Sequence, residues 1–103
     1  MKGFNVANSI KSAQFLLESR LAGAARGEPQ ACFDLGIAYS CGTNGVEIDL
    51  IEAHKWFNLA ALGGSEQGQA MRAEISEDMT AREIVEAQRQ ARAWLAATTR
   101  RVA

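Results

Sequence analysis

Apolar residues recur at helical spacing in several stretches of the chain, and the clearest stretch lies near its middle. From residue 49 to residue 62, apolar positions follow one another at intervals of three and four, which places them on one face of a helix. These positions are Leu50, Ala53, Trp56, Phe57, Ala60 and Ala61. Such a stripe needs partner helices to bury its two aromatic rings. We therefore expect the rest of the chain to pack around this helix.

Helix start and stop signals divide the remaining chain in the same manner. Two residue pairs have the spacing of a capping box, in which each residue satisfies a backbone N–H of the other: Asp49 with Glu52, and Thr80 with Glu83. Ser65 is a further N-cap, Asn8 or Ser9 is expected to cap the first helix, and Pro29 favours the first position of the second. The predicted helices span residues 8–26, 29–41, 49–62, 66–76 and 80–98.

Composition favours an all-α protein, because alanine is abundant, proline occurs once and runs of β-branched residues are missing. The 103 residues suffice for one domain with a modest core. Neither a signal peptide nor a stretch of about 20 apolar residues, as needed to cross a bilayer, stands out in the sequence. We expect a cytoplasmic protein that does not enter membranes, or a periplasmic one if a signal peptide was removed.

The segment from Ala31 to Gly64 resembles one unit of the SEL-1-like repeat, a relative of the tetratricopeptide repeat found in many bacterial proteins. The matching positions are Ala31, Leu35, Gly36, Tyr39, Gly42, Gly45, Val46, Asp49, Ala53, Lys55, Trp56, Ala60, Ala61 and Gly64. Gly27 and Gly64 open similar motifs 37 residues apart, a period typical of stacked helix pairs. The turn between Tyr39 and Gly45 is one residue longer than is usual in the family.

This resemblance implies one domain over residues 1–103, built as a short superhelix of antiparallel helix pairs with about five helices. Residues 1–26 then form an N-terminal helix, residues 27–64 a complete repeat, and residues 65–98 a degenerate unit that caps the array. In the family, the first helices of the pairs line a concave groove. The resemblance also implies an adaptor or scaffold role, with no common catalytic residues and no cofactor.

We expect the partner to contact one stripe of the 29–41 helix. Its apolar face, with Ala31, Leu35, Ala38 and Tyr39, should meet the 49–62 helix. The adjacent face then carries Gln30, Asp34, Ile37 and Cys41, which we call the groove stripe. Asp34 would supply charge, Gln30 amide hydrogen bonds and Ile37 an apolar contact. The alternative is that the stripe touches only the 8–26 helix or water.

The helical pattern also predicts which residues are buried. The expected core residues are Leu35, Tyr39, Ala53, Trp56, Phe57, Ala60, Met71, Ile84, Ala91 and Leu95. Gly36 lies within a helix, where it costs about 1 kcal/mol relative to alanine. This cost suggests a close backbone crossing at Gly36. His54, the single histidine, lies on the polar side of its helix and is expected at the surface.

Two further functions stay open beside the interaction module. Cys32 and Cys41 are too far apart on a helix for a disulfide, and we expect free thiols in a reducing compartment. One of them could still serve a thiol-dependent enzyme or redox protein. The third possibility is a structural module that oligomerises through its repeat ends, whereas the interaction module would be a monomer or weak homo-oligomer. A lone histidine offers no metal cluster, and we expect no catalytic or metal site.

Charge is unevenly distributed, although the net charge is −1. Residues 29–79 carry eight acidic against two basic side chains, which favours a neutral to basic protein or peptide as the partner. Residues 80–103 carry five arginines against two glutamates. Arg82, Arg89 and Arg92 share one face, but Glu86 lies within it and would pair with the first two. A track interrupted in this way binds phosphates poorly, and we expect no nucleic acid.

Overall fold

The computed structural model describes residues 6–99, with side chains from Ile10 onward. Within this range the chain is all-α, with no strand. The helices are α1 (Val6–Ala25), α2 (Pro29–Cys41), α3 (Leu50–Leu62), α4 (Glu66–Ser76) and α5 (Ala81–Thr99). Every predicted helix is present, and each boundary lies within two residues of its predicted position. Residues 1–5 of the expected leader lie outside the described residues.

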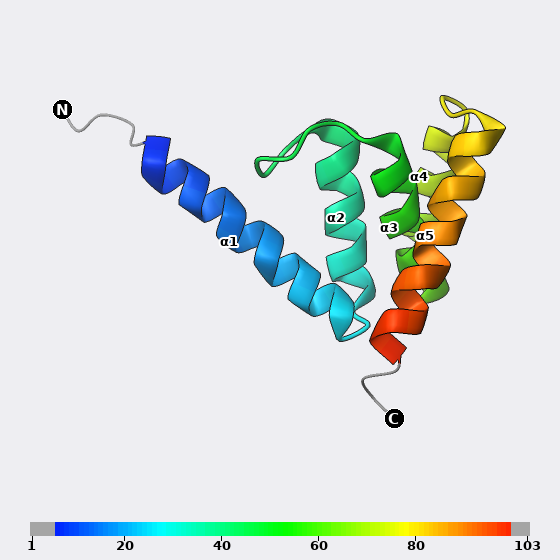
Figure 1. Cartoon of the computed structure of the whole chain (residues 1–103), viewed down its shortest axis with the longest axis horizontal. Coiled ribbons are helices and arrows are strands. Elements are labelled where there is room, and N and C mark those ends of the chain that lie inside the picture. The colour runs from blue at the N-terminus through cyan, green and yellow to red at the C-terminus, as the bar shows by residue number, and fades with distance from the viewer. Residues whose placement is uncertain (1–5, 100–103) are drawn as a thin grey trace.

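Helix α3 occupies the centre of the molecule and packs against α2, α4 and α5. Figure 1 shows α2 and α3 as an antiparallel pair, with α4 and α5 beside α3, while α1 slants away from α2. Helix α1 packs mainly on α2. The sequence prediction that the chain is organised around the 49–62 helix is confirmed.

The predicted caps explain most of the helix starts. Pro29 opens α2, and the Ser65 hydroxyl accepts a hydrogen bond from the backbone N–H of Gly68 at 2.9 Å. The Thr80–Glu83 box is complete, with bonds of 3.2 and 2.8 Å. Asn8 and Ser9 do not cap α1, because that helix has already begun at Val6.

Only one of the two hydrogen bonds of the Asp49–Glu52 capping box forms. The Asp49 side chain accepts from the Glu52 N–H at 3.1 Å, but the N–H of Asp49 donates to the Tyr39 carbonyl instead of the Glu52 carboxylate. Glu52 uses its two oxygens on Trp56 Nε1 (3.0 Å) and Lys55 Nζ (2.9 Å). The need of a buried indole for an acceptor outweighs the second capping bond here.

Two apolar clusters make up the core. The larger cluster joins α1, α2, α3 and α5, and its buried members are Ala24, Ala31, Cys32, Leu35, Trp56, Leu59, Ala60 and Ala91. Trp56 meets Trp94 edge to face, with ring centroids 4.9 Å apart. The smaller cluster joins Ala53, Phe57 and Ile75 between α3 and α4. Helix α3 contributes to both clusters, which is why it is buried on two sides.

The predicted core is largely correct. Six of its residues are buried, namely Leu35, Ala53, Trp56, Phe57, Ala60 and Ala91. Tyr39, Met71 and Ile84 are half-buried. The prediction that Leu95 is buried is wrong, because this residue is 40% exposed. The packed face of α5 runs through Ala87, Ala91 and Trp94, and Leu95 is turned to the flank of that face.

Two glycines permit close contacts around α3. A Cβ added at Gly36 would lie 2.5 Å from the ring of Phe57. The close approach predicted at Gly36 is therefore real, but an aromatic side chain makes it and not a crossing backbone. At Gly68 an added Cβ would lie 2.9 Å from the Cβ of Ala60 and 3.1 Å from the carbonyl oxygen of Phe57. Helix α4 crosses α3 closely at this point, where Gly68 and Ala60 leave room.

Helix α1 packs on the core through only part of its length. Leu17, Leu21 and Ala24 pack onto the larger cluster, but Ile10 and Leu16 are exposed. The loop between α2 and α3 lies beside this part of α1, since a Cβ on its Gly45 would be 3.7 Å from that of Ala13. The first half of α1 consequently stands clear of α2 (Figure 1).

Replacement of Trp56 by alanine is expected to lower the free energy of unfolding by about 3–5 kcal/mol, because Trp56 fills the centre of the larger cluster. Leu62→Ala, at an exposed position of the same helix, is the matched control and should change the free energy by at most about 0.5 kcal/mol. Urea denaturation followed by circular dichroism measures both. A midpoint for Trp56→Ala equal to that of Leu62→Ala would contradict this description of the core.

Candidate functional site

The structure brings only part of the groove stripe into mutual contact. Gln30 Nε2 donates to Asp34 Oδ1 at 2.9 Å, so these two side chains are brought together. Ile37 instead packs against the smaller core cluster, and Cys41 is exposed at the end of α2. A partner that bonds to Gln30 or Asp34 would therefore compete with the hydrogen bond between these two side chains.

Asp34 also faces a basic residue of α1. Arg20 Nε lies 3.3 Å from Asp34 Oδ2, an ion pair by distance that lacks the angle of a hydrogen bond. The two side chains are about one-third exposed. The charge predicted to attract a partner is thus partly compensated within the chain. Asp34 thus contacts the first helix, and its role in binding a partner stays a prediction.

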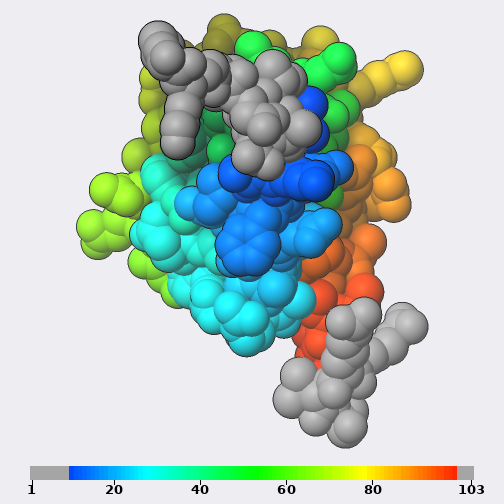
Figure 2. Space-filling view, turned by 90° about the vertical axis from the view of Figure 1, so that its left-hand side faces the viewer, coloured from blue at the N-terminus to red at the C-terminus, as the bar shows by residue number. Residues whose placement is uncertain are grey.

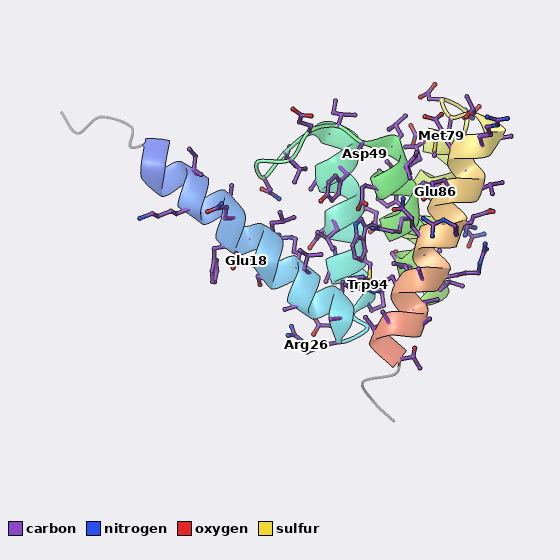
Figure 3. The ribbon with its side chains drawn as sticks, viewed as in Figure 1. Glu18, Arg26, Asp49, Met79, Glu86 and Trp94 are labelled. Atoms are coloured by element: carbon purple, nitrogen blue, oxygen red, sulfur yellow. The ribbon has the colours of Figure 1, made fainter. Side chains whose placement is uncertain are left out.

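A second candidate site is an apolar cavity of about 380 Å³ at the foot of the molecule, where α1, α3 and α5 end. We call it the foot cavity. It is lined by Ala24, Ala25, Arg26, Gly27, Cys32, Leu59, Leu62, Gly63, Trp94, Leu95, Thr98 and Thr99. Figure 3 shows Trp94 reaching from α5 toward α2, with Arg26 at the lower end of α1. The site joins residues that are up to 75 positions apart in the sequence.

The lining of the foot cavity grades from buried to exposed. Ala24, Cys32 and Leu59 are buried, and they belong to the larger core cluster. Leu62 is 65% exposed and Leu95 is 40% exposed, so two large aliphatic side chains border the cavity on the solvent side. Such a gradient presents an apolar surface to any molecule that enters.

Two polar side chains at the foot cavity, those of Arg26 and Thr98, already have partners. Arg26 Nε donates to Glu28 Oε2 at 2.7 Å, and both side chains are exposed. The Thr98 hydroxyl donates to the Trp94 carbonyl at 2.8 Å. The cavity therefore offers mainly dispersion contacts and apolar burial to a ligand.

Sequence reasoning missed this cavity. Leu95 was expected in the core, and Leu62 lies outside the apolar stripe of its helix. The available signal was their position, because both leucines come within the last turns of helices that run parallel to one another. No local pattern shows that these helix ends meet.

The two thiols differ in their surroundings. Cys32 is buried, and desolvation raises the pKa of its thiol to about 11. Cys41 is exposed, with its sulfur 3.7 Å from Ser40 Oγ. Both cysteines are free, as predicted. A nucleophilic cysteine requires a lowered pKa, so the setting of Cys32 opposes this chemistry.

The prediction for His54 was wrong, because only 2% of this residue is exposed. Burial and the nearby Arg72 of α4 lower the pKa of the imidazole. Its Nδ1 has no hydrogen-bond partner among the described residues. Helix α4 covers the face of α3 that the sequence pattern marked as polar, and Asn58 of that face accepts a hydrogen bond from Arg72. His54 is thus a neutral residue held between two helices.

The arginine face of α5 carries the predicted internal ion pair. Arg89 donates to Glu86 through two nitrogens, at 2.9 and 2.6 Å. Gln90 supplies the third bond, and these contacts lower the pKa of Glu86 to about 2. The expected pair with Arg89 is confirmed, while the remaining bond of Glu86 goes to Gln90 and not to Arg82.

No cluster of three or more His, Cys, Asp or Glu side chains among the described residues could hold a metal ion. None of the helices described is long and apolar enough to cross a membrane.

Compared with known proteins, the chain matches no protein-family model, no curated protein and no solved structure. The resemblance to SEL-1-like repeats therefore rests on the residues quoted above and stays a prediction.

We expect stability to fall as the pH drops below about 6.5, the ordinary pKa of histidine. The unfolded chain then binds a proton at His54 that the folded chain resists, so each pH unit lowers the free energy of unfolding by up to about 1.4 kcal/mol. Urea denaturation between pH 7 and pH 5 measures this slope. His54→Leu should flatten it, and an equal slope in that variant would show that other groups cause the dependence.

Thiol labelling should separate the two cysteines. At pH 8 and without denaturant, a maleimide should modify Cys41 within minutes and leave Cys32 unmodified, because Cys32 is buried and protonated. Mass spectrometry of Cys41→Ser and Cys32→Ser variants assigns each adduct, and urea should expose the second thiol. Rapid labelling of Cys32 in the folded chain would revive the thiol-enzyme hypothesis.

Proposed function

We propose that this chain is a non-catalytic protein-interaction module, an adaptor or scaffold, that binds an apolar side chain of a partner protein or peptide in the foot cavity. The observation that carries the proposal is the pair of exposed leucines, Leu62 and Leu95, at the border of an apolar cavity. Binding residues of protein interfaces are commonly apolar anchors seated in such pockets. Leaving two large leucines in water is unfavourable unless a ligand covers them.

The size and chemistry of the foot cavity suit a side chain of a partner. About 380 Å³ lies near the lower end of the range for ligand sites, which favours one or two aliphatic or aromatic side chains over a large cofactor. The aromatic edge of Trp94 and the aliphatic Leu59 suit either kind. Because Arg26 and Thr98 are already bonded, selectivity would come mainly from shape and apolar area.

We further propose a neutral to basic partner. The support is the acidic excess of residues 29–79, which carry eight acidic against two basic side chains, while the ion pair with Glu28 neutralises Arg26 at the cavity. Complementary charge would speed the encounter without supplying most of the affinity. Nucleic acid is not proposed as a partner, since Glu86 interrupts the arginine face of α5.

The SEL-1-like resemblance supports the same role. The packed pair α2–α3 suits one complete repeat, and α4 and α5, which both pack on α3, suit a degenerate capping unit in a single domain of bacterial type. Two free cysteines fit a reducing compartment such as the cytoplasm. Thiol catalysis, the alternative hypothesis, is opposed by the raised pKa of Cys32.

A peptide library displayed on phage and panned against the intact chain tests the proposal. Selected peptides should carry an aliphatic or aromatic anchor, and Leu62→Lys should weaken them at least about tenfold, equal to about 1.4 kcal/mol. Val85→Lys is the matched control, because Val85 is 60% exposed on α5 and does not line the cavity. Fluorescence anisotropy gives the affinities.

Asp34→Lys distinguishes the two candidate sites in the same assay. If the foot cavity binds the peptides, this variant should change affinity less than about twofold once circular dichroism shows that it is folded. If Asp34→Lys weakens the binding of the peptides and Leu62→Lys does not, the foot cavity is not the binding site, and the groove stripe is.

A further inference from the structure

The outward face of α1 carries an apolar residue that the fold leaves uncovered. Phe15 is 69% exposed, more than any other large hydrophobic residue of the described chain. At 100° per residue, Phe15 points away from Leu17, Leu21 and Ala24, which hold α1 to the larger core cluster. Figure 2 shows α1 lying across the front of the molecule, over α2. None of the other described helices packs on this face.

The charges on that face have a symmetric arrangement. Lys11 and Glu18 are seven residues apart, so they lie on one side of the helix, one on each side of Phe15 along its axis. Both are exposed, and neither makes an ion pair within the described part of the chain. The other basic residues of the α1 region, Arg20 and Arg26, already pair with Asp34 and Glu28.

We propose that two copies of this chain associate through the outward faces of α1, packed antiparallel with Phe15 at the two-fold axis. In this arrangement, residues whose numbers add up to about 30 meet across the interface. Lys11 of each copy then lies beside Glu18 of the other, which forms two equivalent ion pairs. Ser12 and Ser19 flank Phe15 and are small enough for the helices to approach closely.

The charges of Lys11 and Glu18 favour the antiparallel arrangement, with a second copy of the chain as the partner. A parallel arrangement of the same faces would place Lys11 against Lys11 and Glu18 against Glu18, which repel each other. In the antiparallel arrangement, a closed two-fold interface uses the same patch on both subunits. Self-complementary charge of this kind favours the chain itself over a partner of a single sign.

The association is weak. Helix α1 has 20 residues and a length of ~30 Å, so one helix face buries well under the ~800 Å² per partner of a standard stable interface. The dimer therefore forms only at high protein concentration. This inference does not depend on the foot cavity, because α1 contributes to that cavity only through its last residues.

Sedimentation equilibrium of the intact chain tests the proposal. The average mass should rise from 11.1 kDa toward twice that value as the concentration increases from about 10 μM to about 1 mM. Phe15→Asp should remain at the monomer mass throughout, and Val85→Asp, at a similarly exposed position on α5, should behave like the parent chain. A parent chain that stays monomeric at 1 mM would overturn the proposal.

Charge reversal tests the orientation. Lys11→Glu and Glu18→Lys should each weaken the dimer several-fold, because each places like charges together across the axis. The double variant carrying both changes should recover the parent dissociation constant. If the double variant is no stronger than either single variant, the antiparallel pairing is wrong.

Disulfide trapping gives a second readout, in a Cys41→Ser background that removes the exposed native thiol. A mixture of Lys11→Cys and Glu18→Cys chains should form the mixed disulfide under air oxidation, since these positions lie side by side in the antiparallel dimer. Lys11→Cys alone should remain unlinked. Rapid linkage of Lys11→Cys to itself would indicate the parallel arrangement and contradict the proposal.

Discussion

The burial of Trp56 is the contact on which the remaining structure depends. Its ring packs against Trp94 of α5 and belongs to the same cluster as Leu35 of α2, so one side chain ties three helices together. A buried indole N–H requires an acceptor. Glu52 supplies it one turn earlier, while Lys55 lies 4.8 Å from the centre of the Trp56 ring and pairs with the same carboxylate.

Helix positions could be predicted from the sequence because their signals are local. Pro29, Ser65 and the Thr80–Glu83 pair act within one helical turn, and the structure contains each of these features. Burial was harder to predict, since it depends on which helix covers which face. His54 is on the polar side of α3 by pattern, yet α4 crosses there. Leu95 fits an apolar stripe, yet α5 turns it to the flank.

The candidate site was less predictable than the fold for the same reason. The groove stripe followed from the spacing of Gln30, Asp34 and Ile37 on one helix, but that spacing could not reveal Arg20 beside Asp34 or the core contact of Ile37. The foot cavity depends on three helix ends that meet in space. Leu62 and Leu95 become neighbours of one cavity only after α3 and α5 have packed.

The attachment of α1 through Leu17, Leu21 and Ala24 means that stability is unevenly distributed along this helix. No residue from Ile10 to Leu16 is buried, so the backbone amides there can open to solvent without unfolding of the core. Any molecule that covers Ile10 and Phe15 would therefore also slow the opening of this half of α1, and its binding would be coupled to local folding.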